Sequence, residues 1–527
     1  VLSTDIFDEF MDHNNLYSVA LSDLSDDEIL ARFLSAELPG RVYQDFYAFL
    51  AVSRNHPIAI RSSSKLEDSH YQPFAGIYST YMIPRHPDNH VMVRMISDAI
   101  REVYASVYYK ASKAYMTATA NVIDEEKMGI ILQEVCGNRH GDIFYPTLSG
   151  VAQSINYYPI GSEKAEDGIA NIAFGLGKLI VEGGLSLRFS PRHYKKILQL
   201  SSVEAALRDT QKEFRALDLK IDSFVPSTDD GVNILRLGIN DVSNDAAMKY
   251  VASTYDYNNN ILRDGINSSG KRIITFANVL QHKLFPLADI LSTLLELGQK
   301  EMNNPIEIEF AANLETPPGT PRIFNFLQIR PIVHTEETSV INLGNVTKTD
   351  TIIYSESALG NGVFRGISDV VYIKPESFNP AGNKEIAADI ERINSEFVKK
   401  GTGYVLIGPG RWGSTDPWLG IPVRWPQISA ARIIIESGLK NYRIDPSQGT
   451  HFFQNLTSFR IGYFTINPYI NEGFYDVEYL NSVKAVYEDS YLRNIRFDSP
   501  LEIMVDGKTH RGVILKPKID VRNPEGV

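Results

Sequence analysis

Cysteine is almost absent from this chain, because Cys136 is the only one in 527 residues. A single cysteine cannot form an internal disulfide, which is typical of a reducing compartment, and we interpret Cys136 as a small apolar filler rather than a nucleophile. Long apolar runs are also missing: no stretch approaches the ~20 residues of a transmembrane helix, and no signal peptide opens the chain. We therefore expect a cytoplasmic protein without a membrane partner.

Positive charge is in deficit, with 52 Lys and Arg against 64 Asp and Glu and a formal net charge of -12. Broad binding to nucleic acid or to anionic membranes needs a basic surface, so the composition argues against both. A local basic pocket for a nucleotide remains compatible with this balance. The hydrophobic content of 43% supports buried cores. The length indicates two to four domains, if a typical domain has about 150 residues.

Two short segments place an arginine beside polar side chains at the end of an apolar strand. The first is Pro57-Ile-Ala-Ile-Arg61-Ser-Ser-Ser64, and the second is Leu327-Gln-Ile-Arg330-Pro331. A guanidinium fork can bond two oxygens at once, so this combination suits polyphosphate. Taken alone, the first segment is equally compatible with a solvated turn.

An oxygen-rich hairpin is predicted next to the second arginine. Residues 306–310 and 322–329 alternate like half-buried strands, and the residues between them, 314–321, are rich in turn formers. The hairpin would bring Glu309 and Gln328 side by side, and hard cations such as Mg²⁺ prefer oxygen ligands of this kind. Alternatively, Glu309 is an ordinary exposed strand residue.

Six motifs in one order make residues 1–332 resemble the nucleotide-binding domain of phosphoenolpyruvate synthase and pyruvate phosphate dikinase, which has an ATP-grasp fold. The motifs are Arg61-Ser-Ser with Glu67-Asp68 and Phe74-Ala-Gly76, Ile131-Leu-Gln-Glu134, Ser149-Gly-Val151, Gly175-Leu-Gly177, Ile308-Glu-Phe310 and Leu327-Gln-Ile-Arg-Pro331.

The resemblance implies a role for each matching residue. Arg61 and Arg330 would hold the phosphates of ATP, and Glu309 and Gln328 would hold Mg²⁺. Gln133 and Glu134 would lie near the adenine, on the strand between the two lobes. Gly175 and Gly177 would belong to the glycine-rich turn of the family and also bind the nucleotide.

Two departures from the family pattern stand out. Members usually begin with a Gly-Gly-Lys segment whose lysine reaches the nucleotide, whereas Val1 to Phe7 resemble the stretch just after it. Either the sequence is truncated or the first strands are missing. Residues 199–272 are poor in family motifs and rich in Asp and Asn, and we interpret them as a lineage-specific insertion.

The spacing of apolar residues along the chain predicts an α/β (α+β) fold. Apolar spacing predicts one long helix over 91–116 and a second over 279–302, with a kink or a second start at Pro286. Residues 335–339 read as a linker. We therefore predict a two-lobed ATP-grasp domain over 1–332, followed by a smaller mixed β/α domain over 340–527.

Two glycine motifs do not fit standard nucleotide loops. Gly175-Leu-Gly-Lys178 lacks the first glycine and the Ser or Thr of a P-loop. Gly408-Pro-Gly-Arg-Trp-Gly413 follows a plausible strand, 404–407, but the Gly- and Pro-rich residues after it cannot easily start the helix that a dinucleotide site needs.

The second domain offers a candidate phosphoryl carrier. Its opening resembles the swivelling phosphohistidine domain of the family, and Gln448-Gly-Thr-His451 resembles that domain's histidine motif. A neutral imidazole nitrogen is nucleophilic near neutral pH, so His451 is predicted to accept phosphate from an exposed loop. A surface or core histidine without chemistry remains the alternative, because Leu419-Gly-Ile-Pro422 precedes the histidine, whereas in the family it follows.

The tryptophans give a further ambiguity. All three lie within residues 412–425, where they form either an aromatic binding wall or core filler.

Together these features predict an ATP-dependent phosphotransferase that passes phosphate from Mg-ATP through His451 to an acceptor, either a small molecule or a protein. The family's pyruvate-binding barrel needs about 250 residues and does not fit after residue 332 together with a histidine domain. The alternatives are a nucleotide-binding regulatory or scaffold protein without turnover, and a binding module that uses the Trp-rich region.

Overall fold

The computed structural model of the chain describes residues 1–67, 76–119, 126–266, 269–332, 343, 346–438, 446–458, 461–507 and 509–517. It divides into two compact units, Val1–Val181 with Leu185–Val333, and Glu182–Gly184 with His334–Val527. The predicted mixed α/β class is confirmed. Motif residues 68–75 and the predicted linker 335–339 lie outside the described residues. Among the described helices, none is long and apolar enough to cross a membrane.

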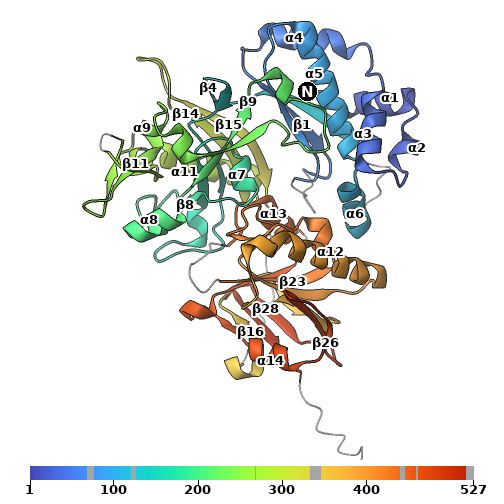
Figure 1. Cartoon of the computed structure of the whole chain (residues 1–527), viewed down its shortest axis with the longest axis vertical. Helices are drawn as coiled ribbons and strands as arrows, with labels where there is room; N and C mark the ends of the chain where they lie inside the picture. The colour runs from blue at the N-terminus through green and yellow to red at the C-terminus, as the bar shows by residue number, and fades with distance from the viewer. Residues whose placement is uncertain are drawn as a thin grey trace, which may run out of the picture. The chain divides into compact units, whose positions relative to one another are not determined.

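The first unit opens with a small antiparallel sheet, in the order β2-β1-β3, with helices gathered around it (Figure 1). A capping box in which Ser25 and Glu28 exchange hydrogen bonds starts one of these helices, α3. The elements are α1 (Thr4–His13), α2 (Tyr17–Ala20), α3 (Asp26–Leu34), α4 (Val42–Val52), β1 (Ile58–Ser64), β2 (Thr80–Ile83), α5 (Asn89–Ser106), α6 (Lys110–Thr119) and β3 (Met128–Glu134).

The single helix predicted over 91–116 is wrong, because the structure has two helices, α5 and α6, with a break at residues 107–109. The end of α5 tightens, since Tyr108 N–H bonds the carbonyl of Ala105, three residues back. The carbonyl of Ser106 accepts the hydroxyl of Ser112 at 2.7 Å and the N–H of Tyr109, only three residues on, at 3.4 Å. Side-chain hydroxyls thus satisfy groups that a continuous helix would have paired internally.

The remainder of the first unit is built on three more sheets. Their orders are β15-β14-β6-β7-β8, β10-β9-β5-β4 and β12-β11-β13. The strands are β4 (Asn138–His140), β5 (Ile143–Tyr145), β6 (Leu148–Gln153), β7 (Ile169–Ala173), β8 (Leu187–Phe189), β9 (Glu213–Asp218), β10 (Ile234–Gly238), β11 (Ala252–Asp256), β12 (Ile261–Asp264), β13 (Lys271–Ile274), β14 (Ile306–Asn313) and β15 (Ile323–Pro331). The helices are α7 (Lys178–Val181), α8 (Val203–Asp209), α9 (Met248–Val251), α10 (Ala277–Leu280) and α11 (Leu287–Met302).

Two predictions about the first unit can be compared directly. The second helix start at Pro286 is confirmed, because Pro286 is the N-cap of α11. Residues 199–272 contribute β9, which pairs with β5 and is therefore part of a sheet of the unit. Whether this segment is specific to one lineage stays a prediction.

The second unit has a seven-stranded sheet, in the order β17-β24-β23-β20-β19-β27-β26, and a five-stranded sheet, in the order β18-β28-β29-β16-β25. Four adjacent strands of the seven-stranded sheet are parallel to one another, in the order β24, β23, β20 and β19. The strands are β16 (Thr351–Ser355), β17 (Ser357–Leu359), β18 (Gly362–Phe364), β19 (Asp369–Ile373), β20 (Tyr404–Pro409), β21 (Arg411–Trp412), β22 (Gly420–Ile421), β23 (Ala431–Ser437), β24 (Gly462–Ile466), β25 (Phe474–Tyr475), β26 (Ala485–Glu488), β27 (Leu492–Arg496), β28 (Ile503–Asp506) and β29 (Arg511–Leu515).

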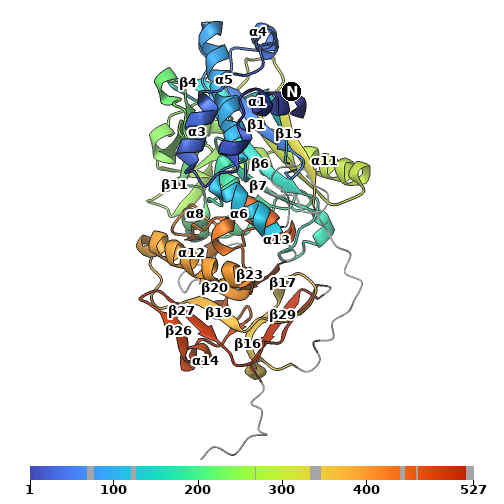
Figure 2. The same ribbon diagram turned by 90° about the vertical axis from the view of Figure 1, so that its right-hand side faces the viewer.

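Both faces of the parallel strands are covered. One face shares an apolar core with the five-stranded sheet, through residues such as Ile353, Val405 and Ile433. The other face carries α12 (Figure 2), whose Phe397 stacks on Tyr404 of β20 at 4.6 Å. Burial on both faces explains why these strands are continuous apolar runs. The helices are α12 (Asn383–Lys400), α13 (His451–Ser458) and α14 (Val477–Ser482).

The glycine loop after β20 leads into the short strand β21, as expected for a segment that cannot start a dinucleotide-binding helix. The tryptophans around it divide into two kinds. Trp412 and Trp425 are buried, whereas Trp418 is 66% exposed. The core-filler interpretation is therefore right for two of the three, and they do not form one aromatic wall.

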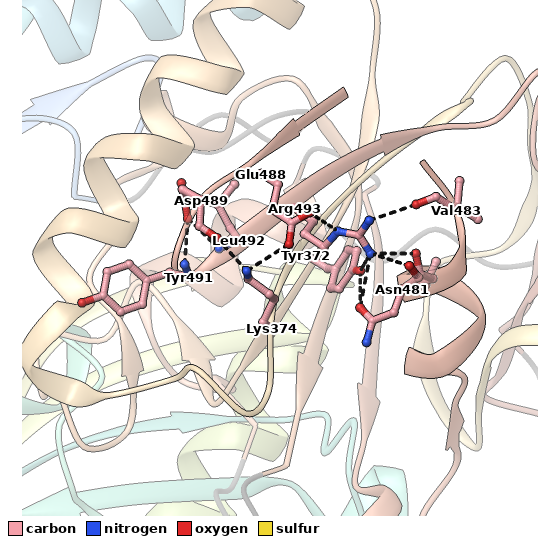
Figure 3. A network of polar contacts seen from close by, with 10 residues as sticks. Tyr372, Lys374, Asn481, Val483, Glu488, Asp489, Tyr491, Leu492 and Arg493 are labelled. Atoms are coloured by element: carbon pink, nitrogen blue, oxygen red, sulfur yellow. Dashed lines mark hydrogen bonds and ion pairs between the residues drawn. The ribbon is translucent and has the colours of Figure 1, made fainter. Parts of the chain in front are cut away.

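A polar network fixes the edge of the seven-stranded sheet (Figure 3). The buried guanidinium of Arg493 donates to the hydroxyl of Tyr372 at 2.9 Å and to Glu488 at 3.1 Å. It also donates to the carbonyls of Asn481 and Val483, both at 3.0 Å. These carbonyls end α14, so one arginine caps a helix and ties it to β19 and β27.

Replacing Arg493 by alanine should lower the free energy of unfolding of the second unit by about 3 kcal/mol, because a buried charged donor and all of its hydrogen bonds are lost. Tryptophan emission during urea unfolding measures this directly, since all three tryptophans lie in that unit. Arg432→Ala, at an exposed position of β23, is the matched control. Equal midpoints for the two variants would contradict the role given to Arg493.

Candidate functional site

Five of the side chains predicted to bind nucleotide or metal meet in one polar cluster in the first unit. Arg61 comes from β1 and Gln133 from β3, while Glu309 lies on β14 and Gln328 and Arg330 lie on β15. We call this group the five-residue cluster. Residues more than 240 positions apart in the sequence thus share one site.

The two arginines donate hydrogen bonds to the same two side chains, Glu309 and Gln328. Arg61 Nη2 lies 2.7 Å from Gln328 Oε1 and 3.4 Å from Glu309 Oε2. Arg330 Nη2 lies 2.9 Å from Gln328 Oε1 and 3.1 Å from Glu309 Oε1. Arg61 Nη1 also donates to Gln133 Oε1 at 3.3 Å. The two arginines thus place two positive charges around one carboxylate and one amide oxygen.

Partial burial strengthens these interactions. The exposed fraction of the side chain is 21% for Arg61, 19% for Glu309 and 11% for Arg330. Charges that are largely withdrawn from water are screened less by solvent and salt than exposed ones. The site is therefore a place where phosphate oxygens would find concentrated positive potential.

The strand register explains the geometry. The predicted hairpin is confirmed, since β14 and β15 pair antiparallel with Glu309 directly opposite Gln328. Directly opposed residues of antiparallel strands project to the same face. On the small sheet, Ala59 is the partner of Gln133, so Arg61 is its diagonal neighbour on the same face. A bulge after Glu309 breaks the register before Phe310.

An apolar cluster holds the small sheet against the neighbouring sheet. Ala59 of β1 and Val135 pack with Phe144, Leu176 and Leu217. The apolar end of β1 is therefore anchored, and Arg61 follows two residues later at the polar end of the same strand. The neighbouring sheet in this contact is β10-β9-β5-β4, whereas the carboxylate of Glu309 that Arg61 meets belongs to a third sheet, β15-β14-β6-β7-β8.

Glu134 does not join the cluster. Its carboxylate accepts a hydrogen bond from the backbone N–H of Arg54, on the opposite face of β3 from Gln133 because successive strand residues alternate. The predicted role of Glu134 near the adenine stays a prediction.

The glycine turn lies between β7 and α7. Gly175 has φ +88°, and a Cβ on it would come 2.7 Å from the carbonyl oxygen of Arg215, so only glycine fits there. Gly177 is less constrained, since a Cβ would lie 3.6 Å from Ser149. The hydroxyl of Ser149 donates to the carbonyl of Gly175 at 2.6 Å, which connects the turn to β6, the strand beside β14.

Sequence reasoning missed a second connection to this turn. Lys178 Nζ lies 2.7 Å from Asp230 Oδ1, and Asp230 Oδ2 accepts the N–H of Thr80 on β2 at 3.2 Å. Asp230 thus links α7 to the small sheet. It belongs to no motif and lies within residues 199–272, so no local pattern could have indicated it.

Cys136 behaves as predicted for a filler. Burial raises the pKa of its thiol to about 12, although Asn325 donates a hydrogen bond to the sulfur. Little thiolate forms near neutral pH, which disfavours nucleophilic chemistry.

His451 is placed differently from the prediction. It is the first residue of α13 and half-buried, not a member of an exposed loop. Thr450 explains the helix start, because its hydroxyl accepts the N–H of Phe453 at 3.1 Å. Gly449 before it has φ +88°. The imidazole is therefore carried on the first turn of a helix, on a half-buried residue.

Comparison with known proteins gives two matches. Residues 1–349 match the family described as the AMP/ATP-binding domain of pyruvate phosphate dikinase, and the whole five-residue cluster falls within them. A protein of Bacillus subtilis (strain 168), described as the uncharacterized phosphotransferase YvkC, is 26% identical over 186 residues. That alignment covers 35% of this chain and 20% of the relative, so the chain spans about a fifth of the relative's length.

Proposed function

The chain belongs to the family of the AMP/ATP-binding domain of pyruvate phosphate dikinase, and from this premise we propose that it is an ATP-dependent phosphotransferase acting on Mg-ATP. The observation that carries the proposal is the five-residue cluster, in which two arginines converge on one carboxylate and one amide oxygen. The description of its relative as a phosphotransferase supports the same reaction class.

The oxygens of the cluster fit a magnesium ion. Glu309 Oε2 and Gln328 Oε1 both lie within reach of a single atom, Arg61 Nη2, so they converge on one locus. Mg²⁺ takes hard oxygen ligands and is usually held by one or two protein groups together with phosphates and water. Bound there, it would offset the charge that develops in phosphoryl transfer.

The protein's own residues would bind and orient the triphosphate. Arg61 and Arg330 would exchange their contacts with Glu309 and Gln328 for phosphate oxygens, which a guanidinium fork can bond in pairs. The freed carboxylate and amide oxygens would then face the cation. Because the arginines come from two different sheets, the phosphates would be held from two sides.

For the second half of the reaction, we extend the proposal to His451 as phosphoryl carrier within a swivel-like domain over 340–527, with an ATP-grasp domain over 1–332. The position of His451 on the first turn of α13 is favourable for a phosphorylated imidazole, because helix N-termini stabilise negative charge. The acceptor would be a small molecule or a protein.

The metal role is tested with Glu309→Gln, which keeps the shape of the side chain and removes its charge. We expect the gain in ATP affinity on adding Mg²⁺ to fall by at least about tenfold, the scale of one charged contact. Calorimetric titration of the full chain with ATP, with and without MgCl₂, measures it. Glu301→Gln, at an exposed position in the last turn of α11, is the control. An unchanged magnesium effect in Glu309→Gln would remove the proposed ligand.

A nucleotide-binding protein without turnover is the second candidate. The half-buried, helical position of His451 favours it, because a carrier is expected on an accessible loop. This candidate predicts ATP binding without any phosphorylated protein. An assay that follows labelled phosphate from ATP onto the protein therefore separates the two candidates.

A further inference from the structure

A second group of ionisable side chains lies in the first unit, apart from the five-residue cluster. His140 is on β4, Asp245 lies between the short 3-10 helix 239–242 and α9, and Glu315 is in the connection between β14 and β15. Within the described residues their ligand atoms all lie within 4.8 Å of one another. The exposed fractions of the side chains are only 12%, 13% and 16%.

The histidine ring is held in a fixed orientation. Its Nδ1 lies 2.8 Å from Asp245 Oδ2, which also accepts the hydroxyl of Tyr145 at 2.6 Å. The ring stacks on Tyr145 with centroids 4.1 Å apart and an interplanar angle of 11°. A carboxylate that accepts a hydrogen bond from Nδ1–H favours the tautomer with the lone pair on Nε2, which is the arrangement found behind metal-binding histidines.

The Nε2 atom is directed at a second carboxylate. Glu315 Oε1 lies 3.7 Å away, too far for a hydrogen bond, and both atoms are buried without a hydrogen-bond partner among the described residues. Two ligands of a tetrahedral ion bonded at 2.0–2.2 Å would be separated by about 3.4 Å. The observed spacing thus fits an ion between the two atoms better than it fits a shared proton.

The local charge also calls for a cation. Asp245 and Glu315 place two carboxylates close to one imidazole, and both side chains are largely buried. Two carboxylates withdrawn from water are costly, and a divalent ion would offset the charge of both.

We propose that His140, Glu315 and Asp245 form a binding site for one divalent first-row transition metal, with Zn²⁺ preferred. His140 Nε2 and Glu315 Oε1 would be direct ligands, while Asp245 orients the imidazole and can offer its second oxygen. One imidazole with carboxylates suits Zn²⁺ better than Mg²⁺, which favours oxygen alone. The ion would tie β4 to the connection of the β14–β15 hairpin, so its role is structural and independent of the proposed transfer reaction.

The test uses the full chain, first treated with EDTA and then titrated with ZnCl₂ and, separately, CoCl₂ in the absence of nucleotide. We expect about one ion per chain, visible Co²⁺ absorption bands, and no displacement by excess MgCl₂. His140→Ala and Glu315→Gln should each weaken Zn²⁺ binding at least tenfold. His282→Ala is the matched control, because His282 pairs with Asp264 at 2.8 Å on the surface of the same unit, and the described residues offer no third ligand there.

The proposal is wrong if the wild type binds no Zn²⁺, or if both site variants bind it as tightly as the wild type. Circular dichroism checks that the variants are folded. If they are not, the Co²⁺-loaded wild type decides the matter, since a ligating imidazole gives paramagnetically shifted proton signals in its NMR spectrum. Their absence would overturn the assignment of His140.

Discussion

Arg330→Ala will weaken the binding of Mg-ATP by about 10- to 150-fold, the effect of removing one partly buried charged hydrogen-bond donor worth roughly 1.5–3 kcal/mol. The reason is geometric. Arg330 is the less exposed of the two arginines in the five-residue cluster, and its Nη2 reaches both Glu309 and Gln328. Calorimetric titration of the full chain with ATP in excess MgCl₂ measures the change.

Two further variants sharpen this experiment. Arg322→Ala removes an exposed arginine just before the start of β15 and should leave ATP affinity unchanged. Arg61→Ala should weaken binding on a similar scale, and the double variant should lose less than the sum, because both arginines share the same two acceptors. If Arg330→Ala binds ATP like the wild type, the phosphate site lies elsewhere.

The cluster was predictable because its parts are encoded locally. Alternating apolar residues mark β14 and β15, the turn formers between them require a hairpin, and the register then fixes Glu309 opposite Gln328. The arginine at the polar end of β1 follows from the same kind of pattern. What the residues alone could not give is that β1 and β14 face each other, which rests on the resemblance to a family.

Other features depend on contacts between distant segments and left no local signal. The break after α5 involves no glycine or proline and arises from hydroxyls that pair with backbone carbonyls. Asp230 and Glu315 each complete a site from within a loop. Arg493 caps α14 from a neighbouring strand, so its role is visible only once the sheet is built. Tertiary partners of this kind lie outside any sequence window.

The position of His451 shows the same limit. The motif Gly449-Thr450-His451 predicts a loop, but the Thr450 hydroxyl that accepts a backbone N–H makes it a helix start. A threonine before a helix and a threonine in a phosphate loop look alike in sequence. The chemistry proposed for the imidazole does not require the loop, but it does require a ring nitrogen that a phosphate can reach.

His451→Ala will abolish acid-labile phosphorylation of the protein while leaving ATP binding intact. The imidazole is the proposed acceptor, and phosphohistidine hydrolyses in acid whereas phosphoserine does not. The full chain is incubated with MgCl₂ and ATP labelled at either the β or the γ phosphate, and the retained label is compared before and after acid treatment. His510→Ala is the matched control, because only His451 and His510 follow residue 334 and His510 is exposed.

Each outcome of that experiment separates binding from turnover. Loss of label in His451→Ala alone supports the carrier, and the labelled position identifies which phosphate moves. Equal labelling of wild type and variant would mean that another residue accepts the phosphate. A wild type that binds ATP through Arg61 and Arg330 but never acquires label would make the protein a nucleotide-binding regulator. In that case the five-residue cluster would still be the nucleotide site, because its geometry does not depend on His451.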